Sequence, residues 1–147
     1  KLIDEYKNGK AELMRDQMLK AICGFHNAEG GVLIIGVKDK PRTVIGIEND
    51  RKLNALSTNE GYRDWIINQI ENEIERKLSL NIRVYFEHIN KKEIARIHIP
   101  KRSNKESGPC QTTYDGQKVV FLRADGRTNE IQPKDIAEIF HGRFLNK

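Results

Sequence analysis

The chain has 147 residues, of which 37% are hydrophobic and 32% are charged, and its formal charge at pH 7 is +5. This length is enough for one hydrophobic core, and this composition excludes a disordered chain. No apolar run in this sequence approaches the roughly 20 residues that a membrane helix needs, so we expect no membrane-spanning helix in it.

We expect a single domain over residues 1–147, located in the cytoplasm and without a membrane partner. The first residues lack the apolar core of a signal peptide, and the two cysteines suggest reduced thiols rather than a disulfide framework. The chain begins without Met, so we expect a fragment of a longer protein with further domains. The excess of 26 basic over 21 acidic residues is compatible with a nucleic-acid partner and equally with solubility alone.

The first part of the chain predicts a strand, a helix and a hairpin. We expect a strand over residues 2–7 and an amphipathic helix over 11–26, where apolar residues recur every three or four positions. The apolar run over 32–37 is too short and too uniform for a surface helix, so it predicts a buried strand. After a turn, residues 43–47 predict a second strand that pairs with it.

A second helix and a second hairpin follow. Ser57 and Glu60 have the spacing of a capping box, and apolar residues at four-residue steps continue the predicted helix to Leu78. Residues 82–89 and 93–99 are rich in β-branched side chains and flank a short polar turn, which predicts the hairpin.

The last part predicts a long loop, a strand and a helix. Residues 100–118 are polar, basic and rich in turn-forming residues, whereas the pattern over 119–124 indicates a strand. Pro133 suits the first turn of a final helix. The order of elements predicts an α+β fold, a single domain with a largely antiparallel mixed sheet flanked by two or three helices.

The glycines before the 32–37 strand do not form a phosphate-binding loop. A Walker loop needs Lys and then Ser or Thr directly after its last glycine, whereas Gly30 and Gly31 are followed by Val32 and Leu33. The order of helix then strand is also the reverse of the order in nucleotide-binding loops. We therefore expect these glycines to permit a tight turn, and we expect no ATP.

Two acidic residues are candidates for a metal site. If residues 2–7 form a strand, Glu5 and Lys7 project to the same face, where the carboxylate could hold a divalent cation and the ammonium could contact phosphate. Asp39 ends the 32–37 strand, and its carboxylate could share that cation. A solvated strand end and an ordinary turn aspartate remain the alternatives. On the first interpretation Glu5, Lys7 and Asp39 are catalytic, and Mg²⁺ or Mn²⁺ is the cofactor.

Basic residues recur in the polar loop and after the strand that follows it. Arginine forms bidentate contacts with phosphate, and a flexible basic loop can follow a nucleic-acid backbone. A solvated loop is the alternative. Together with Lys7, the candidates for nucleic-acid contact are Lys101, Arg102, Lys105, Arg123 and Arg127.

Several motifs resemble those of the Schlafen domain, an Alba-type module often described as DNA-binding. The segments are EYK (5–7), AICGFHNAEGG (21–31), VLIIGVKD (32–39) and VIGI (44–47). They are similar to the family's E-F-K, A-x-x-N-T-x-G-G, G-V-x-D and I-x-G signature, although Ala28 stands where the family has threonine. The closing strands and helix are similar too, so the resemblance spans essentially the whole chain.

The resemblance implies a nuclease. In the nuclease-active members, three carboxylates cut structured RNA such as tRNA with a divalent cation. Two of these carboxylates correspond to Glu5 and Asp39, and the third belongs a few residues before the E-F-K motif, upstream of Lys1. The implied activity is that of a metal-dependent endoribonuclease in bacterial defence or regulation, with RNA favoured over DNA as its partner.

A non-catalytic nucleic-acid-binding module of a regulatory or defence protein is the second hypothesis, and a scaffold for partner proteins is the third. The nuclease requires the cation, whereas the binding module requires only the basic residues. Homodimer formation is compatible with each of them.

Overall fold

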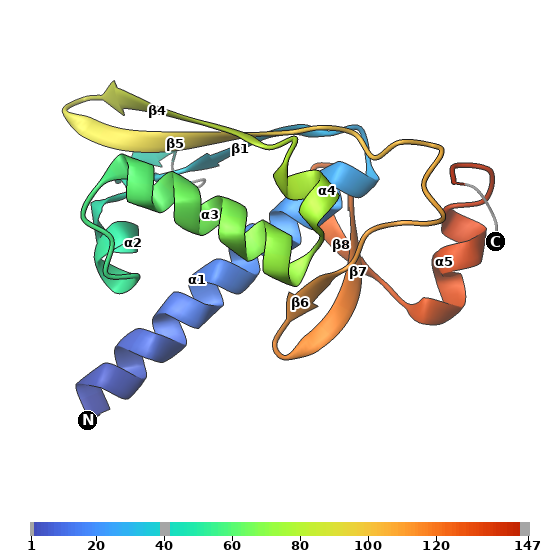
Figure 1. Ribbon diagram of the computed structural model, residues 1–147, viewed down its shortest axis with the longest axis horizontal. Helices are drawn as coiled ribbons and strands as arrows, with labels where there is room; N and C mark the ends of the chain where they lie inside the picture. Colours follow the sequence, from blue (N-terminus) through green and yellow to red (C-terminus); the bar gives the residue numbers. More distant parts are fainter. Residues whose placement is uncertain (1, 39–41, 145–147) are drawn as a thin grey trace.

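The computed structural model describes residues 2–38 and 42–144, and for residues 2–8 it describes the backbone alone. Figure 1 shows a sheet with helices on one side of it and a second sheet beside the longest helix. The strand pairs of the described residues are antiparallel, which confirms the α+β fold class and its largely antiparallel character. They form three small sheets rather than one mixed sheet.

Helix α1 (Leu2–Asn27) contacts both three-stranded sheets. Leu19 and Ile22 are fully buried and belong to the core beneath the first sheet. Gly24 lies against the second sheet, because a Cβ at this position would be 2.8 Å from Cγ2 of Thr128. The absence of a side chain at Gly24 therefore sets how closely α1 approaches that sheet.

The predicted strand over residues 2–7 is wrong, because these residues are the first turns of α1. No proline interrupts the chain there, and a glycine such as Gly9 costs a helix interior only about 1 kcal/mol relative to alanine. The helix predicted from residue 11 onward therefore begins nearer the N-terminus, at Leu2.

The first sheet is built from a central strand and two edges. Its strands, in spatial order, are β1 (Gly31–Ile35), β5 (Lys92–Ile99) and β4 (Arg83–Ile89). The predicted hairpin is confirmed, and its turn consists of Asn90 and Lys91, both with positive φ. Leu33, Ile97 and Val84 lie side by side on the face that joins the core.

The predicted buried strand over 32–37 is only partly correct. Gly36 has φ +104° and interrupts it, so that a separate two-stranded sheet follows. Its strands are β2 (Val37–Lys38) and β3 (Thr43–Val44). Strand β1 lies at a sheet edge, where Val32 is 42% and Ile34 is 47% exposed. Burial was predicted from the apolar run alone, but the helices of the described residues cover one face of the sheet only.

Helix α3 (Asn59–Glu73) lies beside α1 under the first sheet, with Tyr62, Ile66 and Ile70 fully buried. Two short helices flank it in the sequence, α2 (Glu48–Leu53) and α4 (Arg76–Ser79). The predicted strand over 43–47 ends early because Ile47 is the N-cap residue of α2.

The start and the end of α3 both differ from the prediction. Thr58 is the N-cap, and its hydroxyl accepts a hydrogen bond of 3.0 Å from the amide of Gly61, so the predicted capping box of Ser57 and Glu60 is wrong by one residue. The helix leaves its regular geometry at Ile74, and the apolar spacing that continues to Leu78 belongs to α4.

The second three-stranded sheet begins within the predicted loop over 100–118 and includes the predicted strand over 119–124, which is confirmed. Its strands are β6 (Thr112–Tyr114), β7 (Gln117–Ala124) and β8 (Arg127–Ile131), and the chain continues into the short helices η1 (Pro133–Asp135) and α5 (Ile136–Ile139). Asp115-Gly116 and Asp125-Gly126 form the two turns, all four residues with positive φ. The dipeptide Asp-Gly is a strong hairpin signal, so both hairpins could have been predicted.

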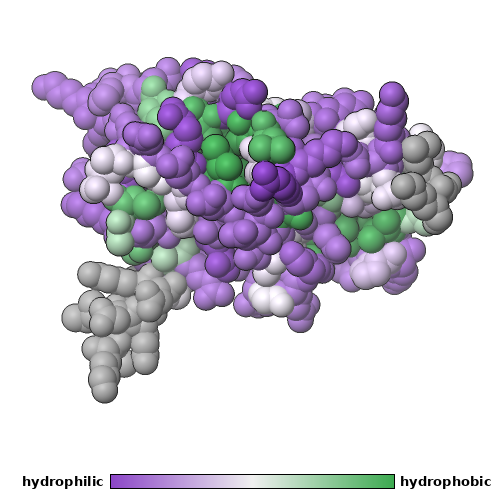
Figure 2. Space-filling model, viewed as in Figure 1, coloured by the Kyte–Doolittle hydropathy of each residue, from purple (hydrophilic) through white to green (hydrophobic). Residues whose placement is uncertain are grey.

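Most of the surface seen in Figure 2 is hydrophilic. On the face drawn in Figure 2, apolar residues are confined to patches between charged and polar ones. Within the described residues, no helix has both the length and the apolar character needed to cross a bilayer.

Asn27, the last residue of α1, joins the helix to the second sheet and to the loop before it. The residue is 0% exposed, and its Nδ2 donates to the carbonyl oxygens of Cys110 and Phe121, both at 2.9 Å. Its Oδ1 accepts a hydrogen bond of 2.8 Å from the Cys110 amide. One side chain therefore satisfies three buried backbone groups that come from two distant segments.

We expect Asn27→Ala to lower the free energy of unfolding by about 3 kcal/mol, because it leaves buried amide and carbonyl groups without partners. Urea unfolding followed by the fluorescence of Trp65 measures the change. Asn104→Ala, in an exposed part of the loop, is the control and should stay within about 0.5 kcal/mol of the parent. Equal stability of the two variants would contradict this account of Asn27.

Candidate nucleic-acid interface

The predicted metal site falls outside the described side chains. Asp39 lies in the 39–41 gap, and for Glu5 and Lys7 only the backbone, within α1, is described. These two residues lie in a helix, where, unlike in a strand, positions two apart do not share a face. In the described part of the chain, no three His, Cys, Asp or Glu side chains are grouped so as to hold a metal ion. The shared cation of Glu5 and Asp39 stays a prediction.

Cationic side chains from separate segments meet at the end of α1. The ammonium of Lys101 lies 3.2 Å from Oε2 of Glu29, and the guanidinium of Arg143 lies 4.0 Å from Oε1 of the same residue. Arg143 also donates a hydrogen bond of 3.1 Å to the carbonyl of Ala28. The C-terminal end of a helix carries a partial negative charge, which favours cations at this place.

Arg123 reaches the same end of α1 from strand β7. Its guanidinium lies 5.3 Å from the centre of the Phe25 ring, in the last turn of the helix, and 3.4 Å from the hydroxyl of Thr128. Arg127 is exposed at the adjoining β7–β8 turn, where it pairs with Ala124. We call Lys101, Arg123, Arg127 and Arg143 the cationic surface.

The cationic surface lies far from the backbone of Glu5. An α-helix rises about 1.5 Å per residue, so the backbones of Glu5 and Phe25 lie roughly 30 Å apart along α1. The structure therefore brings together three of the predicted cations, Lys101, Arg123 and Arg127, at the end of α1 opposite to the Glu5 backbone.

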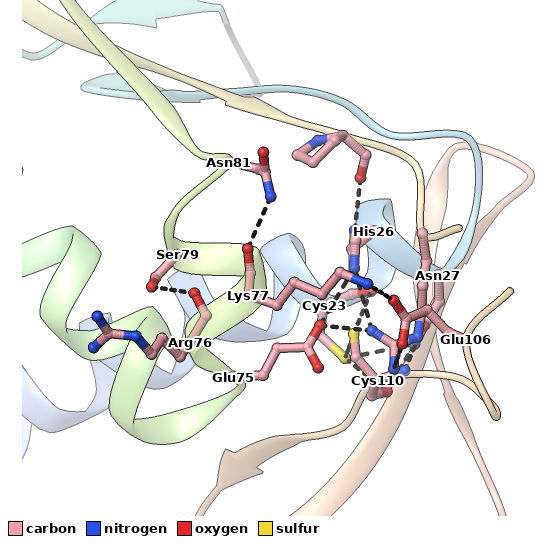
Figure 3. A network of polar contacts seen from close by, with 12 residues as sticks. Cys23, His26, Asn27, Glu75, Arg76, Lys77, Ser79, Asn81, Glu106 and Cys110 are labelled. Atoms are coloured by element: carbon pink, nitrogen blue, oxygen red, sulfur yellow. Dashed lines mark hydrogen bonds and ion pairs between the residues drawn. The ribbon is translucent and has the colours of Figure 1, made fainter. Parts of the chain in front are cut away.

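Arg102 is buried rather than exposed. Its side chain is 9% exposed, and its Nε donates to the carbonyl of Gly108 at 2.6 Å. Its Nη1 donates to Oε1 of Glu75 at 2.6 Å. Figure 3 shows the neighbourhood of this ion pair, where α1, α4 and the loop before β6 meet. Arg102 therefore holds the loop against the helices, while Lys105, further along the same loop, is exposed.

His26 lies beside Arg102 in this network. Its Nδ1 is 2.7 Å from the carbonyl of Pro100, a distance at which the ring nitrogen donates its proton to the oxygen. Nε2 then lacks a proton and lies 3.4 Å from Nη1 of Arg102 and 3.8 Å from Oε1 of Glu75. The pKa of His26 is lowered, mainly by burial and in addition by the Arg102 cation. The hydrogen bond to Pro100 and the carboxylates of Glu75 and Glu106 act in the opposite direction but do not outweigh burial.

A cavity of about 200 Å³ opens beside these residues. Lys77 in its lining is paired with Glu106, and Arg102 is paired with Glu75. Because these charges are matched within the chain, we interpret the cavity as part of the support for the loop rather than as an anion site.

Arg143 is the member of the cationic surface that the sequence patterns did not predict. It comes after the last predicted helix, and nothing in its local pattern distinguishes it from a solvated arginine. Its place beside Glu29 depends on how the chain after β8 packs on the end of α1, which local spacing does not encode.

We expect the stability of the protein to fall between pH 7.5 and pH 5.5, in part through His26. The folded-state pKa of His26 is below its value of 6.5 in the unfolded chain, so the unfolded state binds a proton first as the pH falls. His26→Asn keeps a donor for Pro100 and removes this titration, so it should lose less unfolding free energy over that range. Urea unfolding at the two pH values measures the difference, and equal losses in both proteins would exclude a contribution from His26.

Comparison with known proteins supports the resemblance of the motifs. The sequence model of the family described as "Schlafen, AlbA_2" matches residues 3–132. A search of curated proteins found no match. Among solved structures, the chain is similar to the crystal structure of the DIP2311 protein from Corynebacterium diphtheriae, with a TM-score of 0.61 and 17% sequence identity.

The alignment with that structure covers 89% of this chain but 22% of the other, so the chain spans about a fifth of the length of that protein. At this identity the likeness concerns the fold alone. The family match covers most of the chain, including both three-stranded sheets. The chain therefore belongs to the Schlafen AlbA_2 family, whose domains are related to nucleic acids.

Proposed function

We propose that this domain binds RNA through the cationic surface and cleaves it with a divalent cation held by Glu5 and Asp39. The observation that carries the binding part is the meeting of Lys101, Arg123 and Arg143, from three separate segments, at the last turn of α1. Support for the cleavage part comes from the sequence, where the E-Y-K and G-V-K-D segments lie within the region matched by the family.

The cationic surface has the chemistry to contact a phosphate backbone. Lys101 has a side chain 46% exposed and supplies a mobile point charge, whereas the arginines supply planar donors for phosphate oxygens. Arg123 is oriented by the Phe25 ring and by Thr128, which reduces the conformational entropy that it loses on binding. Such contacts give affinity without base selectivity, so they suit structured RNA of many sequences.

The carboxylates of Glu5 and Asp39 are oxygen ligands of the kind that Mg²⁺ and Mn²⁺ accept. Once bound, such a cation lowers the pKa of a coordinated water and offsets the charge of the phosphate. We assign to Lys7 a phosphate contact, in which its ammonium would offset the negative charge that increases on the oxygens during hydrolysis. Its spacing from Glu5 does not support this role, because positions two apart on a helix do not face each other.

Binding without cleavage is the second candidate function. It is favoured by the roughly 30 Å between the cationic surface and the backbone of Glu5, since a surface so far along α1 does not depend on the carboxylates. A substrate that uses both places must extend over that distance. The two functions differ in their need for a divalent cation.

Removal of a cation from this surface should weaken RNA binding and reduce its dependence on salt. We expect Lys101→Ala and Arg123→Ala each to lower the affinity for an RNA hairpin irrespective of its sequence. Each substitution should also reduce the slope of log affinity against log salt by about 1, since one phosphate fewer is neutralised. Fluorescence anisotropy over a salt series measures both quantities. Lys52→Ala, on α2 with a side chain 70% exposed, is the matched control. The same affinity and slope in all four proteins would remove the cationic surface from RNA binding.

Cleavage should depend on the two carboxylates and on the cation. We expect Glu5→Ala and Asp39→Ala to abolish cutting of a tRNA in the presence of Mn²⁺, and a chelator to abolish cutting by the parent protein. Gel analysis of the products measures this, and Asp64→Ala, at an exposed position of α3, should cut as the parent does. Binding that persists in chelator without any cut product would establish the second candidate function instead.

A further inference from the structure

The first sheet has a face that the helices of the described residues do not cover. The helices lie beneath the sheet in Figure 1, and the core residues of its strands point toward them. On the opposite face, residues two apart along each strand lie in rows across the three strands. Val32, His98 and Arg83 form one row, and Ile34, Arg96 and Tyr85 form the next.

Aromatic and cationic groups lie together in the centre of this face. Tyr85 is 45% exposed, and its ring centre lies 5.0 Å from that of His98, in an edge-to-face arrangement. The guanidinium of Arg96 lies 5.5 Å from the centre of the Tyr85 ring, and its Nε is 3.1 Å from Oε1 of Glu87. Tyr85 is thus held between two planar groups of the neighbouring strand while much of its surface stays in contact with solvent.

One polar atom on this face lacks a partner. The Nε2 atom of His98 is buried and has no hydrogen-bond partner among the described residues. Val32 and Ile34 lie beside this cluster on strand β1, and both are exposed. The face therefore offers flat aromatic area and apolar flanks, with the unpartnered His98 nitrogen buried beneath them.

A groove continues the face toward the β2–β3 hairpin. It has a volume of about 610 Å³, and Ile34, Ile89 and Ile94 contribute apolar atoms to its lining. Arg42 also lines it, with Glu87 as the acidic member of the lining. The groove is therefore mainly apolar and includes one cation and one anion.

The charge of this face selects its partner. On strands β4 and β5, the face carries the exposed cations Arg83 and Lys92 and the half-buried Arg96. Glu87, which is paired with Arg96, is the carboxylate among them, so positive charge is in excess. An apolar protein partner would have to neutralise that excess, whereas a polyanion with flat rings matches both the charge and the aromatic area. Unpaired bases are exposed to such stacking, but the bases of a duplex are stacked on one another.

We propose that the uncovered face of the β1-β5-β4 sheet binds single-stranded RNA, with an unpaired base stacked on Tyr85 and the flanking phosphates near Arg83 and Arg96. This inference rests on the proposed function in that both require RNA as the partner. It assigns a second surface, distinct from the one at the end of α1, that distinguishes unpaired from paired segments of the substrate. A structured RNA with a loop offers both kinds of segment.

The test compares two RNA probes, a 12-nucleotide single strand with a central 2-aminopurine and a duplex of the same length. We expect Tyr85→Ala to weaken single-strand binding about 5- to 150-fold and to change duplex binding less than about twofold. Tyr85→Phe keeps the ring and should bind nearly as the parent does. Leu13→Ala, at a position 56% exposed on α1, on the other side of the sheet, is the control. Parent-like circular dichroism of Tyr85→Ala verifies that it folds.

The base analogue reports stacking directly. Its fluorescence should be quenched when the parent protein or Tyr85→Phe binds, and less so with Tyr85→Ala. Unchanged affinity and quenching in Tyr85→Ala would overturn the inference while leaving the proposed function in place. Absence of RNA binding by the parent protein would remove the proposed function and this inference with it. If Tyr85→Ala abolished self-association in sedimentation experiments without affecting RNA binding, the face would belong to a second copy of the chain, which also overturns the inference.

Discussion

The arrangement of the domain depends on one buried amide at the end of its longest helix. Asn27 binds backbone groups of Cys110 and Phe121, and these belong to the loop before β6 and to β7. An amide presents donors and an acceptor from one small planar group, which an apolar side chain of similar size cannot do. Because the residue is fully buried, no water replaces these bonds. The position of the second sheet relative to α1 follows from this contact and from the close approach at Gly24.

The cationic surface is a consequence of that position. Arg123 meets Phe25 because β7 crosses the last turns of α1, and Lys101 meets Glu29 because the chain leaves β5 beside the same turns. The loop that follows Lys101 is held by Arg102, which is paired with Glu75 near His26. Neighbouring basic residues thus have different roles, one exposed to solvent and the other a buried clamp. Lys101 and Arg102 are adjacent in the chain and both carry a positive charge, so only the difference in their burial separates their roles.

The uncovered sheet face follows from a different constraint. Helices α1 and α3 cover one face of the first three-stranded sheet, and the second sheet packs on α1 instead of on the opposite face. The residues of that opposite face are accordingly a mixture of apolar, aromatic and cationic side chains. An edge strand with exposed Val32 and Ile34 is a place where another molecule can bind. The cations beside it favour a polyanion over an apolar partner.

Local patterns in the sequence determined the α+β class, the β4–β5 hairpin, most of helix α1 and the existence of α3, because period and turn chemistry are properties of neighbouring residues. The motifs around Asn27 and Gly30 were also sufficient to predict the family to which the chain belongs. The Asp-Gly turns at Asp115 and Asp125 carry an equally local signal. Tertiary structure alone decided that β1 is an edge, that Arg102 is buried and that Arg143 joins Lys101, because each of these depends on contacts between segments far apart in the chain. No local spacing encodes which face of a strand a helix will cover.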